Sequence, residues 1–166
     1  NAKIFVNDIE WYEMMNPNNR TRGTYLRENW EPIQHQVETF TEYLNIIPEI
    51  QLVHTGGHSN GHSIILLKQG KETMIHMADL LLTHAHRKPV WVAAVDDYPM
   101  RSIIAKEKWL KEAFENHYKF FFYHDQFFAV AEFDHEGKEI VDYVKRIREP
   151  RLPFTDKQDR KPALYH

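Results

Sequence analysis

A glycine-rich segment with three histidines, residues 54–62, most constrains how this chain can fold. It reads His54-Thr-Gly-Gly-His58-Ser-Asn-Gly-His62 and lies between two apolar runs, residues 50–53 and 64–67. Glycine weakens helices and permits both sharp turns and close approach of the backbone. The pattern therefore predicts a strand, a loop and a second strand, although the spacing of the histidines alone would also suit one face of a helix.

The histidines of this loop are candidate metal ligands. Neutral imidazole is the commonest protein ligand for a transition metal, and a loop free of bulky side chains lets an ion approach closely. The chain has 11 histidines, however, and most histidines in proteins are partly exposed, hydrogen-bonded and inert. His58 is the strongest candidate, because Gly57 precedes it and because it lies at the centre of the loop.

Two further polar residues interrupt or end apolar runs later in the chain. Asp79 is a carboxylate inside an otherwise apolar run, and burying an unpaired carboxylate is costly, so such a residue is usually paired. His124 follows an aromatic run and precedes Asp125. Since each run is typical of a strand, one rim of a sheet could gather His58, Asp79 and His124 into a metal site.

Composition excludes several classes of function. The chain is 42% hydrophobic, which suits a globular fold, and its net charge of −3 lacks the basic footprint of a nucleic-acid-binding protein. No apolar run approaches the ~20 residues that span a bilayer, so we expect no membrane partner and a cytoplasmic location. The absence of cysteine leaves His, Asp and Glu as metal ligands.

Hydrophobic periodicity predicts strands interleaved with helices, which indicates an α/β or α+β fold. We expect helices over residues 9–15, 32–44 and 103–118, with Ser102 as the N-cap of the last. The expected strands cover residues 3–6, 50–54, 63–68, 73–78, 120–123, 127–133 and 139–144.

Three segments together resemble one known family. Gly57-His58-Ser-Asn-Gly-His62 resembles the glycine-histidine-threonine-proline-glycine-histidine loop of the metallo-β-lactamase superfamily. Met77-Ala-Asp79-Leu-Leu resembles its strand with the metal-bridging aspartate, and Phe122-Tyr-His124-Asp125 resembles its last ligand segment. Within the superfamily the chain is most similar to YtnP-type N-acyl homoserine lactonases, which are quorum-quenching enzymes.

The resemblance implies an αββα sandwich, of which the chain holds only a part. Members carry an upstream His-x-His-x-Asp-His signature that supplies the first metal ligands, and this chain lacks it. Its single His-x-His, at His84 and His86, is followed by Arg-Lys-Pro, so we regard it as unrelated to metal binding. We therefore expect residues 1–145 to be the C-terminal part of a metallo-β-lactamase-like domain and residues 146–166 to be an extended tail.

The resemblance also implies a site and a reaction. Two metal ions, most often zinc, would share a hydroxide and the carboxylate of Asp79, with His58 on one ion and His124 on the other. The hydroxide would open the lactone ring of the substrate. The residues expected to orient the ligands by hydrogen bonds are His62, Asp96 and Asp125.

Several alternatives remain open at this stage. Tyr25 and Trp30 could contact an acyl chain or could simply pack. The same metal centre serves phosphotriesterases and other metallohydrolases. The chain alone would bind one zinc ion or none, and it could be a non-catalytic fragment. Uncovered apolar strands predict that it associates with itself as a homodimer.

Overall fold

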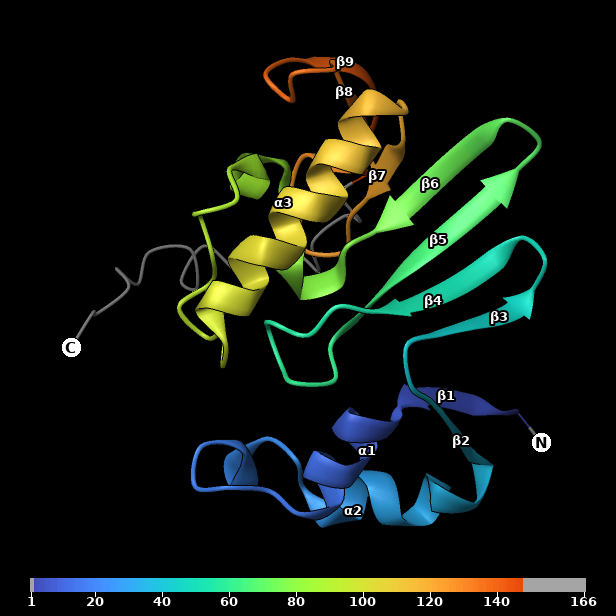
Figure 1. Ribbon diagram of the computed structural model, residues 1–166, viewed down its shortest axis with the longest axis vertical. Coiled ribbons are helices and arrows are strands. Elements are labelled where there is room, and N and C mark those ends of the chain that lie inside the picture. The colour runs from blue at the N-terminus through green and yellow to red at the C-terminus, as the bar shows by residue number, and fades with distance from the viewer. Residues whose placement is uncertain (1, 148–166) are drawn as a thin grey trace, which may run out of the picture.

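The computed structural model describes residues 2–147, and much of this part of the chain forms one mixed sheet (Figure 1). The sheet has seven strands in the order β3-β4-β5-β6-β7-β8-β9. Their bounds are Tyr43–Ile47 (β3), Ile50–His54 (β4), Ser63–Gln69 (β5), Glu72–His76 (β6), Lys119–Phe121 (β7), Phe128–Phe133 (β8) and Ile140–Lys145 (β9). Neighbours are antiparallel except β6 and β7, which are parallel because the chain between them crosses over through a helix.

That crossover helix, α3 (Pro99–Glu115), lies across the sheet and closes the core (Figure 1). Ile64 and Leu66 on β5 are both buried, whereas Ile65 and Leu67 are only half-buried. This is expected, because successive side chains of a strand alternate between faces. The helix contributes Trp109 and Leu110 to the same cluster. Further buried members are Ile75, Met77, Leu80, Leu81, Ala105, Ala113, Phe120, Phe122, Ala131 and Phe133.

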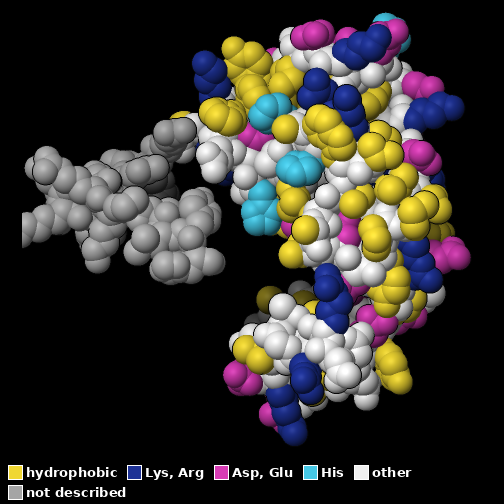
Figure 2. All heavy atoms as spheres, turned by 90° about the vertical axis from the view of Figure 1, so that its left-hand side faces the viewer, with side chains coloured by type: hydrophobic (Ala, Val, Ile, Leu, Met, Phe, Trp, Pro, Cys, Tyr) yellow, Lys and Arg dark blue, Asp and Glu magenta, His cyan; other side chains and the backbone are white. Residues whose placement is uncertain are grey.

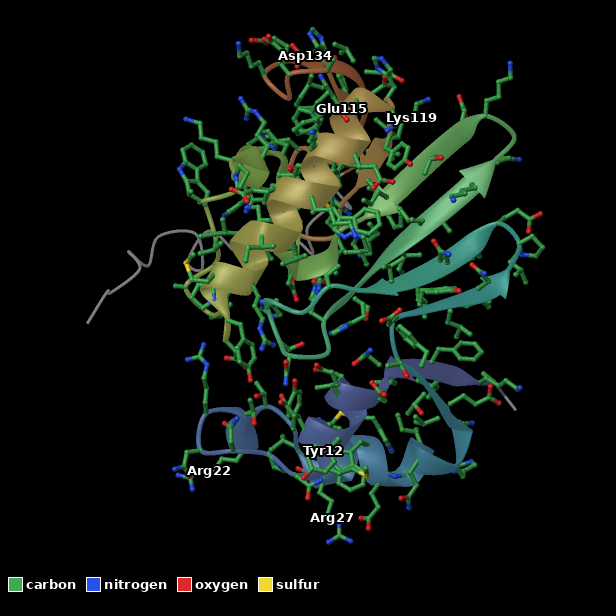
Figure 3. The ribbon with its side chains drawn as sticks, in the orientation of Figure 1. Tyr12, Arg22, Arg27, Glu115, Lys119 and Asp134 are labelled. Atoms are coloured by element: carbon green, nitrogen blue, oxygen red, sulfur yellow. The ribbon has the colours of Figure 1, made fainter. Side chains whose placement is uncertain are left out.

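Residues 2–40 form a separate lobe below the main sheet in Figure 1. Its two parallel strands are β1 (Ile4–Asn7) and β2 (Val37–Phe40), and its helices are α1 (Asp8–Met15), η1 (Thr21–Gly23), α2 (Arg27–Trp30) and η2 (Glu31–Gln36). The buried side chain of Asn7 caps α1 and also donates to the carbonyls of Phe40 and Thr41. The charged residues Arg22 and Arg27 point outward from this lobe (Figure 3).

The helix predicted over residues 32–44 is wrong. A short 3-10 helix begins with Pro32 near its start, and the chain then becomes extended in β2 and β3. The helical spacing of Val37, Phe40 and Leu44 was misleading, because these residue types also fit strands. Pairing of β2 with β1 and of β3 with β4 satisfies the backbone instead.

Ser102 is not the N-cap of α3, which was also predicted. Pro99 occupies the first turn, where its missing N–H costs nothing, so the helix begins earlier than expected. Ser102 lies inside the helix, is fully buried and packs against the glycine loop. The strands and the helix over residues 9–15 were placed within a few residues of their observed bounds.

The predicted tail begins at residue 146, and residues 148–166 lie outside the described part of the chain. Within residues 2–147, no helix is long and apolar enough to cross a membrane.

Candidate metal centre

The glycine loop between β4 and β5 is shaped by close packing on two helices. Gly57 has a φ of 105°, and a Cβ there would lie 2.7–2.8 Å from atoms of Ser102 at the start of α3. A Cβ on Gly61 would overlap the backbone of Glu10 on α1. Larger residues at these two positions would force the loop away from both helices.

Hydrogen bonds hold the centre of this loop in place. The Glu10 carboxylate accepts from the Ser59 hydroxyl at 2.6 Å and from the Gly61 N–H at 3.1 Å. The carbonyl of His58 accepts from the N–H of Asp97 at 2.9 Å. The backbone that carries His58 is therefore fixed from both sides.

The imidazole of His58 is oriented by a buried carboxylate. Its Nδ1 lies 2.9 Å from Oδ1 of Asp96, whose side chain is 2% exposed. Because an ionised carboxylate only accepts hydrogen bonds, Nδ1 is the donor in this pair, and the neutral form of this tautomer would present a lone pair at Nε2. That Nε2 lies 3.4 Å from Oδ2 of Asp79.

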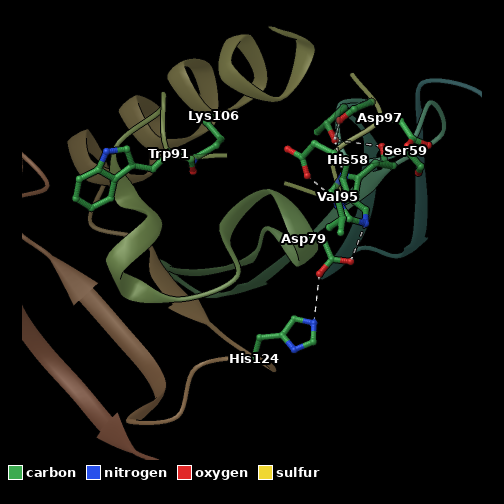
Figure 4. A network of polar contacts seen from close by, with 12 residues as sticks. His58, Ser59, Asp79, Trp91, Val95, Asp97, Lys106 and His124 are labelled. Carbon is green, nitrogen blue, oxygen red and sulfur yellow. Dashed lines mark hydrogen bonds and ion pairs between the residues drawn. The ribbon is translucent and has the colours of Figure 1, made fainter. Parts of the chain in front are cut away.

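Asp79 lies between two histidines at the rim of the sheet (Figure 4). It belongs to the 3-10 helix η3 (Ala78–Leu81), which follows β6. Ala78, the first residue of this helix, turns the chain with a φ of 45°. Leu80 and Leu81 enter the core, so Asp79 projects the other way and is 26% exposed. Its second oxygen, Oδ1, lies 3.4 Å from Nε2 of His124.

These distances suit shared metal coordination. Two ligand atoms of one tetrahedral zinc ion, each about 2.0–2.2 Å from the metal, are about 3.3–3.5 Å apart. His58 and His124 lie at such a distance from different oxygens of Asp79. Among residues 2–147, however, no three His, Asp or Glu side chains surround a single point. The described residues thus place two pairs of donor atoms at Asp79, Oδ2 with Nε2 of His58 and Oδ1 with Nε2 of His124.

His62 and His54 have other partners. His62 is buried, and its Nδ1 lies 2.8 Å from the Thr55 hydroxyl, while Nε2 has no hydrogen-bond partner among the described residues. Burial, and then the nearby charge of His58, lower the pKa of His62 to about 4. Its ring packs edge-on against His58. Nε2 of His54 lies 2.9 Å from the carbonyl oxygen of Asn60.

Asp125 lies with His84 and not with any of the three candidate ligands. Its wholly buried carboxylate is 2.6 Å from Nδ1 of His84 and also accepts from the N–H groups of His84, Phe127 and Phe128. Burial alone would raise the pKa of this carboxyl, but the N–H donors outweigh it and the pKa is lowered.

The His84-x-His86 segment forms a short 3-10 helix, η4 (His84–Arg87), which hydrogen bonds hold in place. Nδ1 of His86 lies 2.8 Å from the Thr83 hydroxyl. The fully buried ammonium of Lys106 donates to the carbonyls of His86 and Trp91. Burial lowers the pKa of Lys106 to about 8. In the described part of the chain, no hydrogen bond or ion pair joins His84 or His86 to Asp79.

A cavity of about 780 Å³ opens beside the histidines. Figure 2 shows histidine side chains gathered above a hollow that separates the first lobe from the rest of the surface. The polar residues of the lining include His58, Asp79 and Tyr25. The apolar residues of the lining are Phe5, Val6, Phe40, Leu52, Ile65 and Val95.

Sequence reasoning missed Tyr123 as a residue of this site. Its hydroxyl donates to Oδ1 of Asp79, although the aromatic run before His124 was interpreted as sheet core. Alternation was the available signal: Phe120 and Phe122 are buried, whereas Tyr123 is 47% exposed on the other face.

Of the two aromatic residues left open by the sequence, Tyr25 lines the cavity and Trp30 does not. The Tyr25 hydroxyl donates to Glu10, and burial together with this hydrogen bond raises the pKa of Tyr25. Trp30 packs edge-on against Trp11.

No protein-family model matches the chain, and no curated protein matches it. Solved structures do. A probable metal-dependent hydrolase from Staphylococcus aureus is 35% identical, with a TM-score of 0.85 over 88% of this chain and 53% of the other. The hydrolase AbOPH, of the beta lactamase superfamily, is 18% identical with a TM-score of 0.71 over 90% of this chain and 57% of its own.

A third match is AidC, a dizinc quorum-quenching lactonase solved with the product N-hexanoyl-L-homoserine. It is 17% identical, with a TM-score of 0.67 over 90% of this chain and 56% of AidC. The chain therefore spans about half the length of these structures. The chain shares its mixed α/β fold with all three structures, and its sequence is 35% identical to that of the first, the probable metal-dependent hydrolase.

Proposed function

We propose that this chain supplies about half of a metal-dependent hydrolase. The complete protein, which would have the length of the relatives, is called the parent protein. One observation carries the proposal. Nε2 of His58 and Nε2 of His124 each lie 3.4 Å from a different oxygen of Asp79. A carboxylate flanked in this way can bridge two ions, and its two oxygens leave room for one ion on each side.

The roles of the side chains follow from their contacts. His58 would hold one ion and His124 the other, with Asp79 shared between them. Asp96 keeps the proton of His58 on Nδ1, so that Nε2 stays free to ligate. A divalent ion held there would supply a Lewis acid that polarises a carbonyl and lowers the pKa of water. Zinc suits the imidazole and carboxylate donors.

We infer that the substrate is the lactone ring of an N-acyl homoserine lactone. The cavity supports this choice, because His58 and Asp79 line it together with the apolar side chains of Phe5, Phe40 and Leu52. A polar ring could lie at the metal centre while an acyl tail is buried along the apolar wall. The likeness to AidC is in keeping with this substrate.

Substitution of Asp79 tests the proposal. Asp79→Ala in the parent protein should remove both ions and nearly all hydrolysis, because each ion loses one of its two ligands from this chain. Metal content by elemental analysis and turnover on a panel of lactones and phosphotriesters measure the outcome. Asp134→Ala, at a half-buried carboxylate that accepts from the Lys138 N–H in the turn between β8 and β9, serves as the matched control and should retain both properties. Full turnover in Asp79→Ala would refute the metallohydrolase proposal, and turnover of phosphotriesters alone would refute the lactone.

A non-catalytic, self-associating fragment is the second candidate, and the sheet edges favour it. The edge strands β3 and β9 carry exposed apolar side chains, among them Tyr43, Ile47 and Val144. Exposed edges of this kind pair readily with another chain. Light scattering should therefore detect a homodimer of the 166-residue chain. A strictly monomeric chain that hydrolyses lactones would exclude this candidate.

A further inference from the structure

The side chain of Tyr123 makes a contact that the proposed function does not use. Its hydroxyl donates to Oδ1 of Asp79, the oxygen that faces His124. The ring packs against His124 at a centroid distance of 4.0 Å and edge-on against His76 at 5.1 Å. His76 is itself held by the carbonyl of Phe121 at 2.9 Å. The phenol is thus held by aromatic neighbours while its hydroxyl meets the carboxylate.

The orientation of the Asp79 carboxylate is otherwise weakly determined. Rotation about the last bond of an aspartate side chain is broad, so packing of the Asp79 stem does not decide which way the two oxygens point. Tyr123 is the hydrogen-bond donor to Asp79 in the described part of the chain, apart from the two histidines at 3.4 Å. Without it, the carboxylate would be free to swing away from one of them.

We propose that Tyr123 is a positioning residue, which holds Asp79 with Oδ1 toward His124 and Oδ2 toward His58 so that one carboxylate serves two ions. The inference rests on the proposed function. A carboxylate oxygen has lone pairs for both a phenol and an ion, so the hydrogen bond and metal ligation are compatible.

The role differs from that of a ligand, and it predicts a graded effect. Removing a residue that orients a metal ligand typically lowers metal affinity by about 10–100-fold, whereas removing a shared ligand abolishes binding. Tyr123→Phe deletes the hydroxyl and keeps the ring that packs on His124 and His76. The variant should therefore fold normally and bind metal weakly.

Tyr118→Phe is the matched control. The Tyr118 hydroxyl also donates to a carboxylate, Oε1 of Glu112 at 3.3 Å, at the end of α3 that is remote from the glycine loop. This variant loses the same kind of hydrogen bond with no contact to Asp79. Tyr12→Phe, at a side chain that is 64% exposed on the first lobe (Figure 3), controls for loss of a phenol hydroxyl as such.

The experiment is a titration of the metal-free parent protein with Co²⁺, followed by visible absorption, together with a thermal melt of each metal-free variant. We expect Tyr123→Phe to weaken Co²⁺ binding about 10–100-fold and to alter the absorption of the bound ion, with an unchanged melting temperature. Tyr118→Phe and Tyr12→Phe should bind as the wild type does, and Asp79→Ala should not bind.

Any other result would overturn this inference, either alone or together with the proposed metal centre. Wild-type affinity in Tyr123→Phe, with binding lost in Asp79→Ala, would overturn this inference and leave the proposed function standing. Equal losses in Tyr123→Phe and Tyr118→Phe, each with a lower melting temperature, would show a general effect on stability and would also overturn it. Binding that survives in Asp79→Ala, or that is absent from the wild type, would overturn the proposed metal centre and the inference together.

Discussion

Two aspartate–histidine pairs in this molecule have the same kind of hydrogen bond, between Nδ1 of the histidine and the carboxylate. They differ in what faces the other ring nitrogen, Nε2. Nδ1 of His58 is 2.9 Å from Asp96, and Nδ1 of His84 is 2.6 Å from Asp125. Both carboxylates are buried, and because an ionised carboxylate only accepts hydrogen bonds, Nδ1 is the donor in both pairs. Beyond His58, however, Nε2 faces Asp79, whereas the described residues offer no hydrogen-bond acceptor or second candidate ligand to Nε2 of His84.

The two carboxylates are also used differently. The side chain of Asp96 is hydrogen-bonded to His58, while Asp125 accepts the N–H groups of His84, Phe127 and Phe128 as well as the His84 ring. Asp125 therefore fastens two backbone segments together. An aspartate behind a histidine is not in itself a sign of metal binding, because the atom that the other ring nitrogen faces decides the role.

The largest difference is expected between the two histidines. His58→Ala should abolish metal retention by the parent protein, since an ion loses a direct ligand. His84→Ala should retain most of the metal. Dialysis against a weak chelator followed by elemental analysis compares the two. Loss of metal in both variants would mean that the two pairs are equivalent and that His84 belongs to the centre.

Substitution of the carboxylates should separate ligand orientation from stability. Asp96→Asn should lower metal affinity by about 10–100-fold, because the His58 ring loses the partner that orients it. Asp125→Asn should mainly lower the free energy of unfolding, by about 2–3 kcal/mol, because buried N–H groups lose a charged acceptor. Metal titration and urea unfolding of both variants test this contrast, which disappears if each variant shows both defects to the same extent.

The effect of Asp125 on stability should depend on pH. The pKa of its carboxyl is lowered on folding from the ordinary value of 3.8, so the unfolded state takes up a proton first as the pH falls. The stability that Asp125 contributes is full above that value and is lost as the pH falls through the folded-state pKa. Urea unfolding at a series of pH values should show the gap between wild type and Asp125→Asn closing in acid. A gap that stays constant down to pH 2.5 would argue against an ionised Asp125.

Smaller effects are expected from the flanking histidines of the glycine loop. His62→Ala should weaken metal binding by about 10–100-fold, because its ring packs against His58. His54→Ala should have the mildest effect, since it loses one hydrogen bond to the carbonyl of Asn60. Zinc titration ranks the variants, and equal losses at His54, His58 and His62 would mean that the loop acts as one folding unit.

Local sequence signals were sufficient for the glycine loop and for most strands. Glycines at positions 56, 57 and 61 interrupt any helix and leave space for Ser102 and Glu10, so a strand, a loop and a strand follow from residue types alone. The structure brings His58, Asp79 and His124 together, as the sequence suggested from the ends of three apolar runs.

Long-range packing was beyond the reach of the sequence. Asp96 and Asp125 were assigned the same role, yet the side chain of Asp125 contacts His84, which is not one of the candidate ligands. The segment of residues 32–44 has a helical period but pairs as strands, because β1 and β4 offer edges that no local pattern reveals. Tyr123 was missed because an aromatic run indicates a core, and only the fold shows which ring leaves it.

The proposed function requires that two ions share Asp79, one beside His58 and one beside His124. Anomalous X-ray diffraction from crystals of the zinc-loaded parent protein would locate these ions. We expect two zinc peaks, one within bonding distance of Asp79 Oδ2 and His58 Nε2, and the other within bonding distance of Asp79 Oδ1 and His124 Nε2. A protein that binds zinc with no peak at Asp79, or with its peak at His84, would contradict the proposed function.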